Sequence, residues 1–148
     1  MNAVFDLKLA DSLARKYFSQ GYHCSEAAVR AITEVLDGSV DPQLMNVSTP
    51  FCGGMSGTGR NACGVLSGAL IVIGSKFGRS LPDQDDTTCM ELAKEYYEEF
   101  EKMANCSSVN CNTLREHRPN GSCNDYVANG VTLAIQLIEK YSKEDRPI

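Results

Sequence analysis

The chain has 148 residues, which is enough for one domain with a substantial hydrophobic core. Asp and Glu outnumber Lys and Arg by 19 to 14, so the formal net charge is −5, and the lack of a basic run argues against a nucleic-acid-binding protein. The first residues lack a basic stretch followed by an apolar core, so we expect no signal peptide and a cytoplasmic protein. Seven cysteines in such a protein predict metal binding or redox chemistry rather than a framework of structural disulfides.

The hydrophobic periodicity along the chain is that of helices. Apolar side chains recur every four residues from Phe5 to Tyr17, and similar stripes follow in later segments. No segment alternates apolar and polar residues for long enough to predict a β-strand. In chain order, we predict helices over residues 5–18, 24–36, 61–78, 84–104 and 122–141, with short helical segments over residues 41–45 and 110–116.

The stretch Phe51–Arg79 is expected to be the centre of the fold. It begins as a glycine-rich loop and continues as a helix, about Asn61 to Gly78, that is apolar almost all round. The apolar part is too short to cross a bilayer, so we expect a buried core helix. Gly64 and Gly68 lie on one face of this helix and leave room for another backbone to approach closely.

Together these elements predict an all-α protein. Residues 1–148 are expected to form a single compact helical domain of five or six helices around the buried central helix. We expect Asn61 to cap the central helix, and Leu81–Asp83 to break the chain and cap the helix that follows. The polar tail, residues 143–148, contains a proline and is expected to fray.

Four cysteines share one kind of position, the start of a predicted helix. A helix N-terminus carries partial positive charge and free N–H groups, which stabilise a thiolate or the negative charge of a thiolate-ligated cluster. If the four helix starts meet in the fold, they form one site that can ligate a metal centre. The alternative is that each cysteine is a small buried apolar side chain. The four are Cys24, Cys63, Cys111 and Cys123.

The other three cysteines have separate interpretations. Cys89 is in phase with the apolar side of its predicted helix, which favours core packing. Cys106 lies five residues before Cys111, a spacing that occurs in some iron–sulfur sites. Cys52 adjoins the glycine-rich loop and could serve as a resolving thiol or as a spare ligand.

The glycine-rich loop runs from Cys52 to Arg60, just before the central helix. Such a loop can present backbone N–H groups to an anion, but this one lacks the Gly-Lys-Ser/Thr ending of a P-loop, and no strand precedes it. We therefore expect it to turn tightly beside the cysteine site. There Gly53 and Gly54 would contact a bound group, and Arg60 would add positive charge.

At these residues the sequence resembles the family of redox-active proteins labelled C_GCAxxG_C_C. The segments that carry the resemblance cover most of the chain: residues 21–29 with Cys24, residues 51–55, residues 63–68 with Cys63, Cys111 with Leu114, and Cys123 with Val127. This chain departs from the family pattern in two ways. Val65 replaces the alanine of the central motif, and Cys52, Cys89 and Cys106 are additional.

The resemblance implies a redox function, and members of the family are often encoded near transporters. The split-Soret cytochromes c look related to the family and carry an iron–sulfur centre besides haem. Covalent haem is not implied here, because the chain has no Cys-x-x-Cys-His. The relation implies an iron–sulfur cluster on the four shared cysteines and a homodimer.

We therefore expect a redox protein, either an oxidoreductase or an electron carrier, that uses the four cysteines in one of two ways. They ligate an iron–sulfur cluster, with a two-iron cluster favoured, or they cycle between dithiol and disulfide. In the thiol version Cys63 attacks, and Cys24 is the second catalytic cysteine. The alternative is a non-redox helical binding module or metal carrier that works with a membrane transporter. The redox partner cannot be named from the sequence, and neither nucleic acid nor a membrane-embedded segment is expected.

Overall fold

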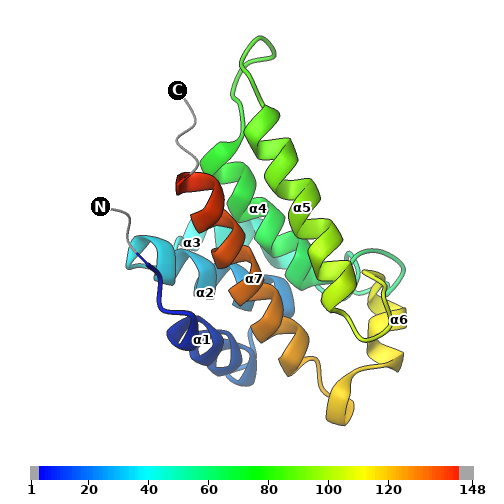
Figure 1. Ribbon diagram of the computed structural model, residues 1–148. Helices are drawn as coiled ribbons and strands as arrows, with labels where there is room; N and C mark the ends of the chain where they lie inside the picture. The colour runs from blue at the N-terminus through cyan, green and yellow to red at the C-terminus, as the bar shows by residue number, and fades with distance from the viewer. Residues whose placement is uncertain (1–3, 144–148) are drawn as a thin grey trace.

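The computed structural model describes residues 4–143, which form an all-α fold without a β-strand in that range (Figure 1). The predicted fold class is therefore confirmed. Two short α-helices, α3 and α6, and two 3-10 turns, η1 and η2, complete the described chain. Residues 144–148 of the tail that is predicted to fray lie outside the described residues. The long helices are α1 (Leu7–Ser19), α2 (Cys24–Asp37), α4 (Gly64–Phe77), α5 (Thr87–Met103) and α7 (Asn124–Lys143), and the short elements are α3 (Pro42–Ser48), η1 (Thr49–Phe51), α6 (Cys111–Glu116) and η2 (Pro119–Gly121).

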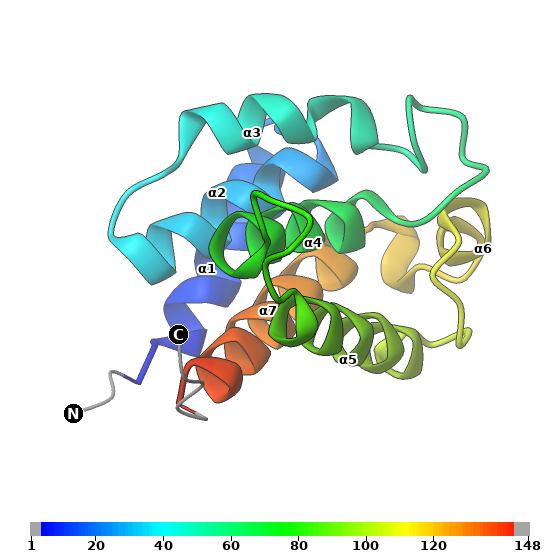
Figure 2. The ribbon, with the colours of Figure 1, turned by 90° about the horizontal axis from the view of Figure 1, so that it is seen from above.

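The helix α4 is the central element, as the sequence predicts. It contacts α2 and α3 on one side and α5 and α7 on the other (Figure 2). Val65, Val72 and Ile73 are fully buried on it. Because neighbouring helices cover α4 on both sides, its side chains are apolar almost all round, which an exposed helix could not tolerate.

Two glycines bring α4 close to the first turn of α2. A Cβ atom on Gly68 would lie 2.6 Å from the carbonyl oxygen of Ser25. A Cβ atom on Gly64 would collide with the Cys24 sulfur and lie 3.2 Å from the carbonyl oxygen of Phe51. The close approach predicted from Gly64 and Gly68 is confirmed, and the backbone that approaches them belongs to α2 and the end of η1.

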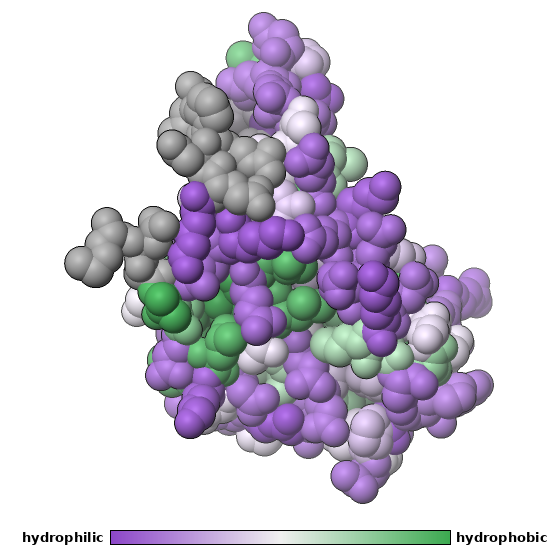
Figure 3. Space-filling model, viewed as in Figure 1, coloured by the Kyte–Doolittle hydropathy of each residue, from purple (hydrophilic) through white to green (hydrophobic). Residues whose placement is uncertain are grey.

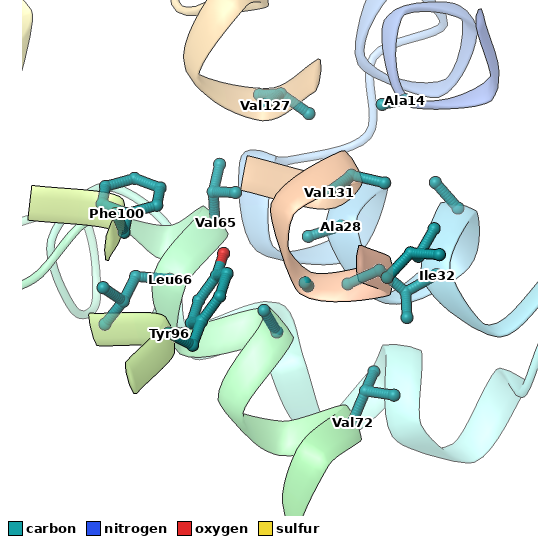
Figure 4. Packing of buried hydrophobic residues seen from close by; sticks show 14 of the residues in the cluster. Ala14, Ala28, Ile32, Val65, Leu66, Val72, Tyr96, Phe100, Val127 and Val131 are labelled. Atoms are coloured by element: carbon teal, nitrogen blue, oxygen red, sulfur yellow. The ribbon is translucent and has the colours of Figure 1, made fainter. Parts of the chain in front are cut away.

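On the other side of α4, aromatic side chains join α4, α5 and α7. Figure 4 shows Tyr96 and Phe100 of α5 packed beside Val65 of α4, with Val131 of α7 nearby. The buried Tyr96 hydroxyl donates a hydrogen bond of 3.0 Å to the carbonyl oxygen of Gly130, so it has the partner that a buried polar group requires. This bond fixes α5 against α7.

Two predicted helix caps are wrong. Asn61 does not cap α4, because its carbonyl oxygen accepts the Cys111 N–H at 2.9 Å in an extended segment, and the N-cap of α4 is Cys63 itself. Asp83 does not cap α5, whose N-cap is Asp86. Residues before Thr87 form a loop in which the Gln84 side chain accepts hydrogen bonds from backbone N–H groups, so this helix begins later than predicted.

Polar side chains cover most of the face that Figure 3 shows, with one hydrophobic patch over the region of α1 and α7. None of the helices in residues 4–143 combines the length and the apolar character that a membrane-spanning segment needs.

The contact at Gly68 yields a stability prediction. Replacing Gly68 by Ala should destabilise the fold by about 1–3 kcal/mol, because the Ser25 carbonyl is backbone and cannot move aside. The matched control is Gly74→Ala in the same helix, where nothing lies within 4 Å and Ala should stabilise by about 0.5–1 kcal/mol. Urea unfolding followed by circular dichroism measures both, and equal effects of the two variants would contradict the close contact.

Candidate functional site

A cavity of about 480 Å³ lies where the starts of α2, α4, α6 and α7 meet. Its lining contains the four cysteines singled out in the sequence, together with Cys52. Cys89 and Cys106 are not part of this lining; both are half-buried and pack against the core. The structure therefore brings together Cys24, Cys52, Cys63, Cys111 and Cys123.

Each of the four predicted cysteines lies at a helix N-terminus. Cys24 is the first residue of α2, and Cys111 is the first residue of α6. Cys63 is the N-cap of α4. The carbonyl oxygen of Cys123 accepts the N–H of Val127 at 3.0 Å, the first helical hydrogen bond of α7. Four helix starts thus point their partial positive charge toward one region.

A short antiparallel bridge between Ala62 and Asn110 joins segments far apart in the chain. The Cys63 N–H donates to the Val109 carbonyl oxygen at 2.8 Å, and the Cys111 N–H donates to the Asn61 carbonyl oxygen at 2.9 Å. The bridge therefore fixes the backbones of Cys63 and Cys111 relative to each other. No sequence pattern predicts this bridge, because a single bridged pair is too short to show the alternation of a strand.

The glycine-rich loop has an unusual backbone. Five successive residues, 53–57, have φ between +54° and +73°. Hydrogen bonds from Ser56 N–H to Pro50 O at 2.7 Å and from Gly57 N–H to Cys52 O at 3.1 Å close the loop on itself. Glycine is needed at Gly54 for a second reason, since a Cβ there would lie 2.6 Å from the Cβ of Cys111.

The residues predicted to support the site lie in different places. Gly53 lines the cavity, and its backbone N–H faces the Cys24 sulfur and lowers the pKa of that thiol. Gly54 packs behind Cys111. Arg60 is exposed and does not line the cavity; its carbonyl oxygen accepts a hydrogen bond of 2.9 Å from the Asn110 side chain.

Two other arginines bring positive charge to the site. Arg115 lines the cavity and lowers the pKa of the Cys111 thiol. The Arg118 guanidinium lies 3.9 Å from the Cys123 sulfur. Neither arginine is predicted from the sequence, although Arg115 is four residues after Cys111 and so shares its face of α6.

Burial dominates the electrostatics of the thiols. Burial raises the pKa of Cys24, Cys63 and Cys111, most strongly at Cys63, which is 8% exposed. The backbone N–H groups of Val65 and Leu66 lower the Cys63 pKa, but by less than burial raises it. Burial therefore disfavours the Cys63 thiolate in the free, reduced protein, and the predicted role of Cys63 as the attacking thiol remains a prediction.

Aromatic side chains form much of the remaining wall, including Phe18, Tyr22 and Tyr126. The Tyr126 hydroxyl lies 2.7 Å from Asn105 Oδ1 and 3.0 Å from the Leu114 carbonyl oxygen, so its ring is held in place. The Arg30 guanidinium lies 4.5 Å from the centre of the Tyr22 ring, which fixes the opposite wall. The cavity lining is thus mostly apolar apart from its sulfur atoms and basic groups.

The thiols surround the cavity without converging on a single point. Within residues 4–143, no three side chains of Cys, His, Asp or Glu are arranged closely enough to hold one metal ion. A two-iron cluster differs from a single ion in its requirements, because its four cysteines bind in pairs, two to each iron.

Comparison with protein families gives one match. The model of the family described as "Putative redox-active protein (C_GCAxxG_C_C)" matches residues 22–137, a range that contains all five cavity cysteines. No curated protein and no solved structure matches the chain.

The burial of Cys63 predicts its reactivity. In reduced, metal-free protein, iodoacetamide should label Cys63 more slowly than Cys52, because Cys63 is buried and its raised pKa keeps it protonated at neutral pH. The labelling rate should continue to increase with pH well above the ordinary cysteine pKa of about 8.5, because burial shifts formation of the Cys63 thiolate to higher pH. Peptide mass spectrometry of a labelling time course measures this, with the denatured protein as control. Rapid labelling of Cys63 at neutral pH would contradict it.

The glycine-rich loop offers a matched pair of variants. Gly54→Ala and Gly57→Ala both place a side chain at positive φ, which costs about 1–2 kcal/mol at each position. Only Gly54→Ala also crowds Cys111 and the Gly59 backbone, so it should lose about 1–3 kcal/mol more unfolding free energy than Gly57→Ala, where nothing lies within 4 Å. Thermal unfolding measures the difference. Equal losses would show that Cys111 is not held against the loop.

Proposed function

This chain belongs to the C_GCAxxG_C_C family of redox-active proteins, and from that premise we propose that it carries electrons on an iron–sulfur cluster held by four cysteines. The ligands are Cys24, Cys63, Cys111 and Cys123, and the proposed cluster has two irons. Such a cluster would supply one-electron chemistry.

One observation carries the proposal. Four cysteines from separate helix starts line one cavity of about 480 Å³, together with a fifth thiol. Four thiols are the complete ligand set of a two-iron or four-iron cluster. Core packing alone gives no reason for four cysteines to share both a helix-start position and a cavity.

The burial of the thiols favours ligation over free thiol exchange. A buried thiolate without a counter-charge is unstable, which is why burial raises the pKa of Cys24, Cys63 and Cys111. A bound cation reverses this effect and keeps coordinating thiols deprotonated. In this cavity a thiolate bound to iron would therefore be more stable than a thiolate that forms without a neighbouring cation.

The surroundings would then stabilise the negative charge of a cluster. The helix N-termini, the Gly53 N–H and the Arg115 side chain all bring positive charge or hydrogen-bond donors to the cavity. Hydrogen bonds to cluster sulfurs and nearby charge set the reduction potential in such proteins. The aromatic and aliphatic wall would limit the access of water.

A second candidate is dithiol–disulfide cycling, for which the presence of five thiols in one cavity is the specific support. The non-redox binding module is a weaker alternative, because it does not account for that grouping. A cytoplasmic location, a homodimer and a link to a membrane transporter remain predictions that follow from the sequence and the family resemblance.

The proposal predicts iron and sulfide in the protein. Protein purified without oxygen, or reconstituted with iron and sulfide, should be brown and contain iron and acid-labile sulfide in equal amounts. Substituting any of the four ligands by Ser should lower both contents, whereas Cys89→Ser should not, because Cys89 lies outside the cavity. Metal analysis, sulfide assay and electron paramagnetic resonance measure this, and circular dichroism confirms that each variant folds.

Two outcomes separate the alternatives. Protein that stays colourless even after anaerobic reconstitution, and whose thiols oxidise and reduce reversibly, would support disulfide cycling and contradict the cluster. Colourless protein whose cavity thiols remain unreactive in the folded state would contradict both redox versions.

A further inference from the structure

Cys52 is the one cavity thiol that does not start a helix. It directly follows η1 and precedes the left-handed run of residues 53–57. Its side chain is half-buried and lines the cavity with the four proposed ligands. A fifth thiol in a four-ligand site needs a separate role.

The structure holds Cys52 beside Cys24. A Cβ atom on Gly64 would collide with the Cys24 sulfur and would lie 3.2 Å from the Cys52 Cα, so both cysteines lie against the same point on α4. The Thr49 hydroxyl donates a hydrogen bond of 2.6 Å to the Glu26 carboxylate, which ties η1 to the first turn of α2. The segments that carry the two cysteines are therefore neighbours with a fixed orientation.

The electrostatic effects among the thiols agree with Cys52 being one of the close neighbours of Cys24. Among the neighbouring thiols that raise the pKa of Cys24, Cys52 has the larger effect and Cys111 the smaller. Among the neighbouring thiols that raise the pKa of Cys111, Cys123 has a larger effect than Cys52. At Cys63, which is more deeply buried, Cys24 has the larger effect and Cys111 the smaller, so Cys63 is the other close neighbour of Cys24 and the competing disulfide partner.

We propose that Cys24 and Cys52 form a reversible disulfide in the cluster-free protein, with a low-molecular-weight disulfide such as oxidised glutathione as the oxidant. One cysteine, as its thiolate, attacks the small disulfide, forming a mixed disulfide and releasing one small thiol. The second cysteine then attacks the mixed disulfide and releases the other small thiol. The two cysteines lose two electrons and two protons, and the small disulfide becomes two thiols.

This bond would control ligand availability. Cys24 is one of the four proposed cluster ligands, so a Cys24–Cys52 disulfide leaves only three. That consequence rests on the proposed function, whereas the formation of the disulfide does not. Oxidation would also connect the glycine-rich loop covalently to the start of α2.

The test is disulfide mapping of iron-free, reduced protein after exposure to oxidised glutathione, with free thiols alkylated before digestion. Cleavage after Lys and Arg places Cys24 in residues 17–30 and Cys52 in residues 31–60, each as the single cysteine of its peptide. We expect the link between these two peptides to dominate in the wild type and in Cys89→Ser. It should be absent in Cys52→Ser and should disappear after reduction with dithiothreitol.

The proposal is overturned if Cys24 and Cys52 stay reduced, or if Cys24 links mainly to Cys63 or Cys111. Anaerobic reconstitution gives an independent readout. Cys52→Ser should take up as much iron and sulfide as the wild type, and a loss in this variant would make Cys52 a ligand and overturn the proposal. If no variant takes up a cluster, the proposed function fails, and the mapping still tests the disulfide.

Discussion

The close contact between α4 and the first turn of α2 is the constraint on which the site depends. Gly64 and Gly68 allow it, because they place only hydrogen atoms where a side chain would meet Cys24 and Ser25. With the two helices at this distance, the N-cap of α4 lies beside the start of α2, and Cys63 lies near Cys24. A larger spacing would widen the cavity and separate the sulfur atoms. The motif Cys63-Gly64 thus combines a cavity cysteine and the space for its neighbour Cys24 in two successive residues.

The site balances burial against charge. Burial favours the neutral thiol, while helix N-termini, the Gly53 N–H and Arg115 favour the thiolate. In the free protein burial has the larger effect at Cys24, Cys63 and Cys111. Donors that are too weak to ionise a lone buried thiol still contribute when a cation lies next to the sulfur, because ligand and cation then compensate each other. Burial therefore disfavours the free thiolates, and the proposed iron ligation would offset this effect.

The helices and the close contact at Gly64 and Gly68 could be predicted from the sequence, because each depends on residues that are near one another in the chain. Helical periodicity identified the long helices, and the spacing of Gly64 and Gly68 predicted a close backbone contact that the structure contains. The predicted role of Asn61 failed because its backbone pairs with Cys111, a partner about fifty residues away that no local pattern indicates. The positive charge was assigned to Arg60, beside Cys63 in the sequence, whereas the fold brings Arg115 to the cavity.

The glycine-rich loop adopts an unfavourable backbone conformation that positions groups of the site. Met55 and Ser56 adopt positive φ although neither is glycine, and such backbone conformations are maintained only when surrounding contacts compensate for them. The compensation here includes the hydrogen bonds from Ser56 to Pro50 and from Gly57 to Cys52. The tight turn that results lets the Gly53 N–H face the Cys24 sulfur. A relaxed, extended loop of the same length would move this donor and Cys52 away from α2, and the fifth thiol would leave the cavity.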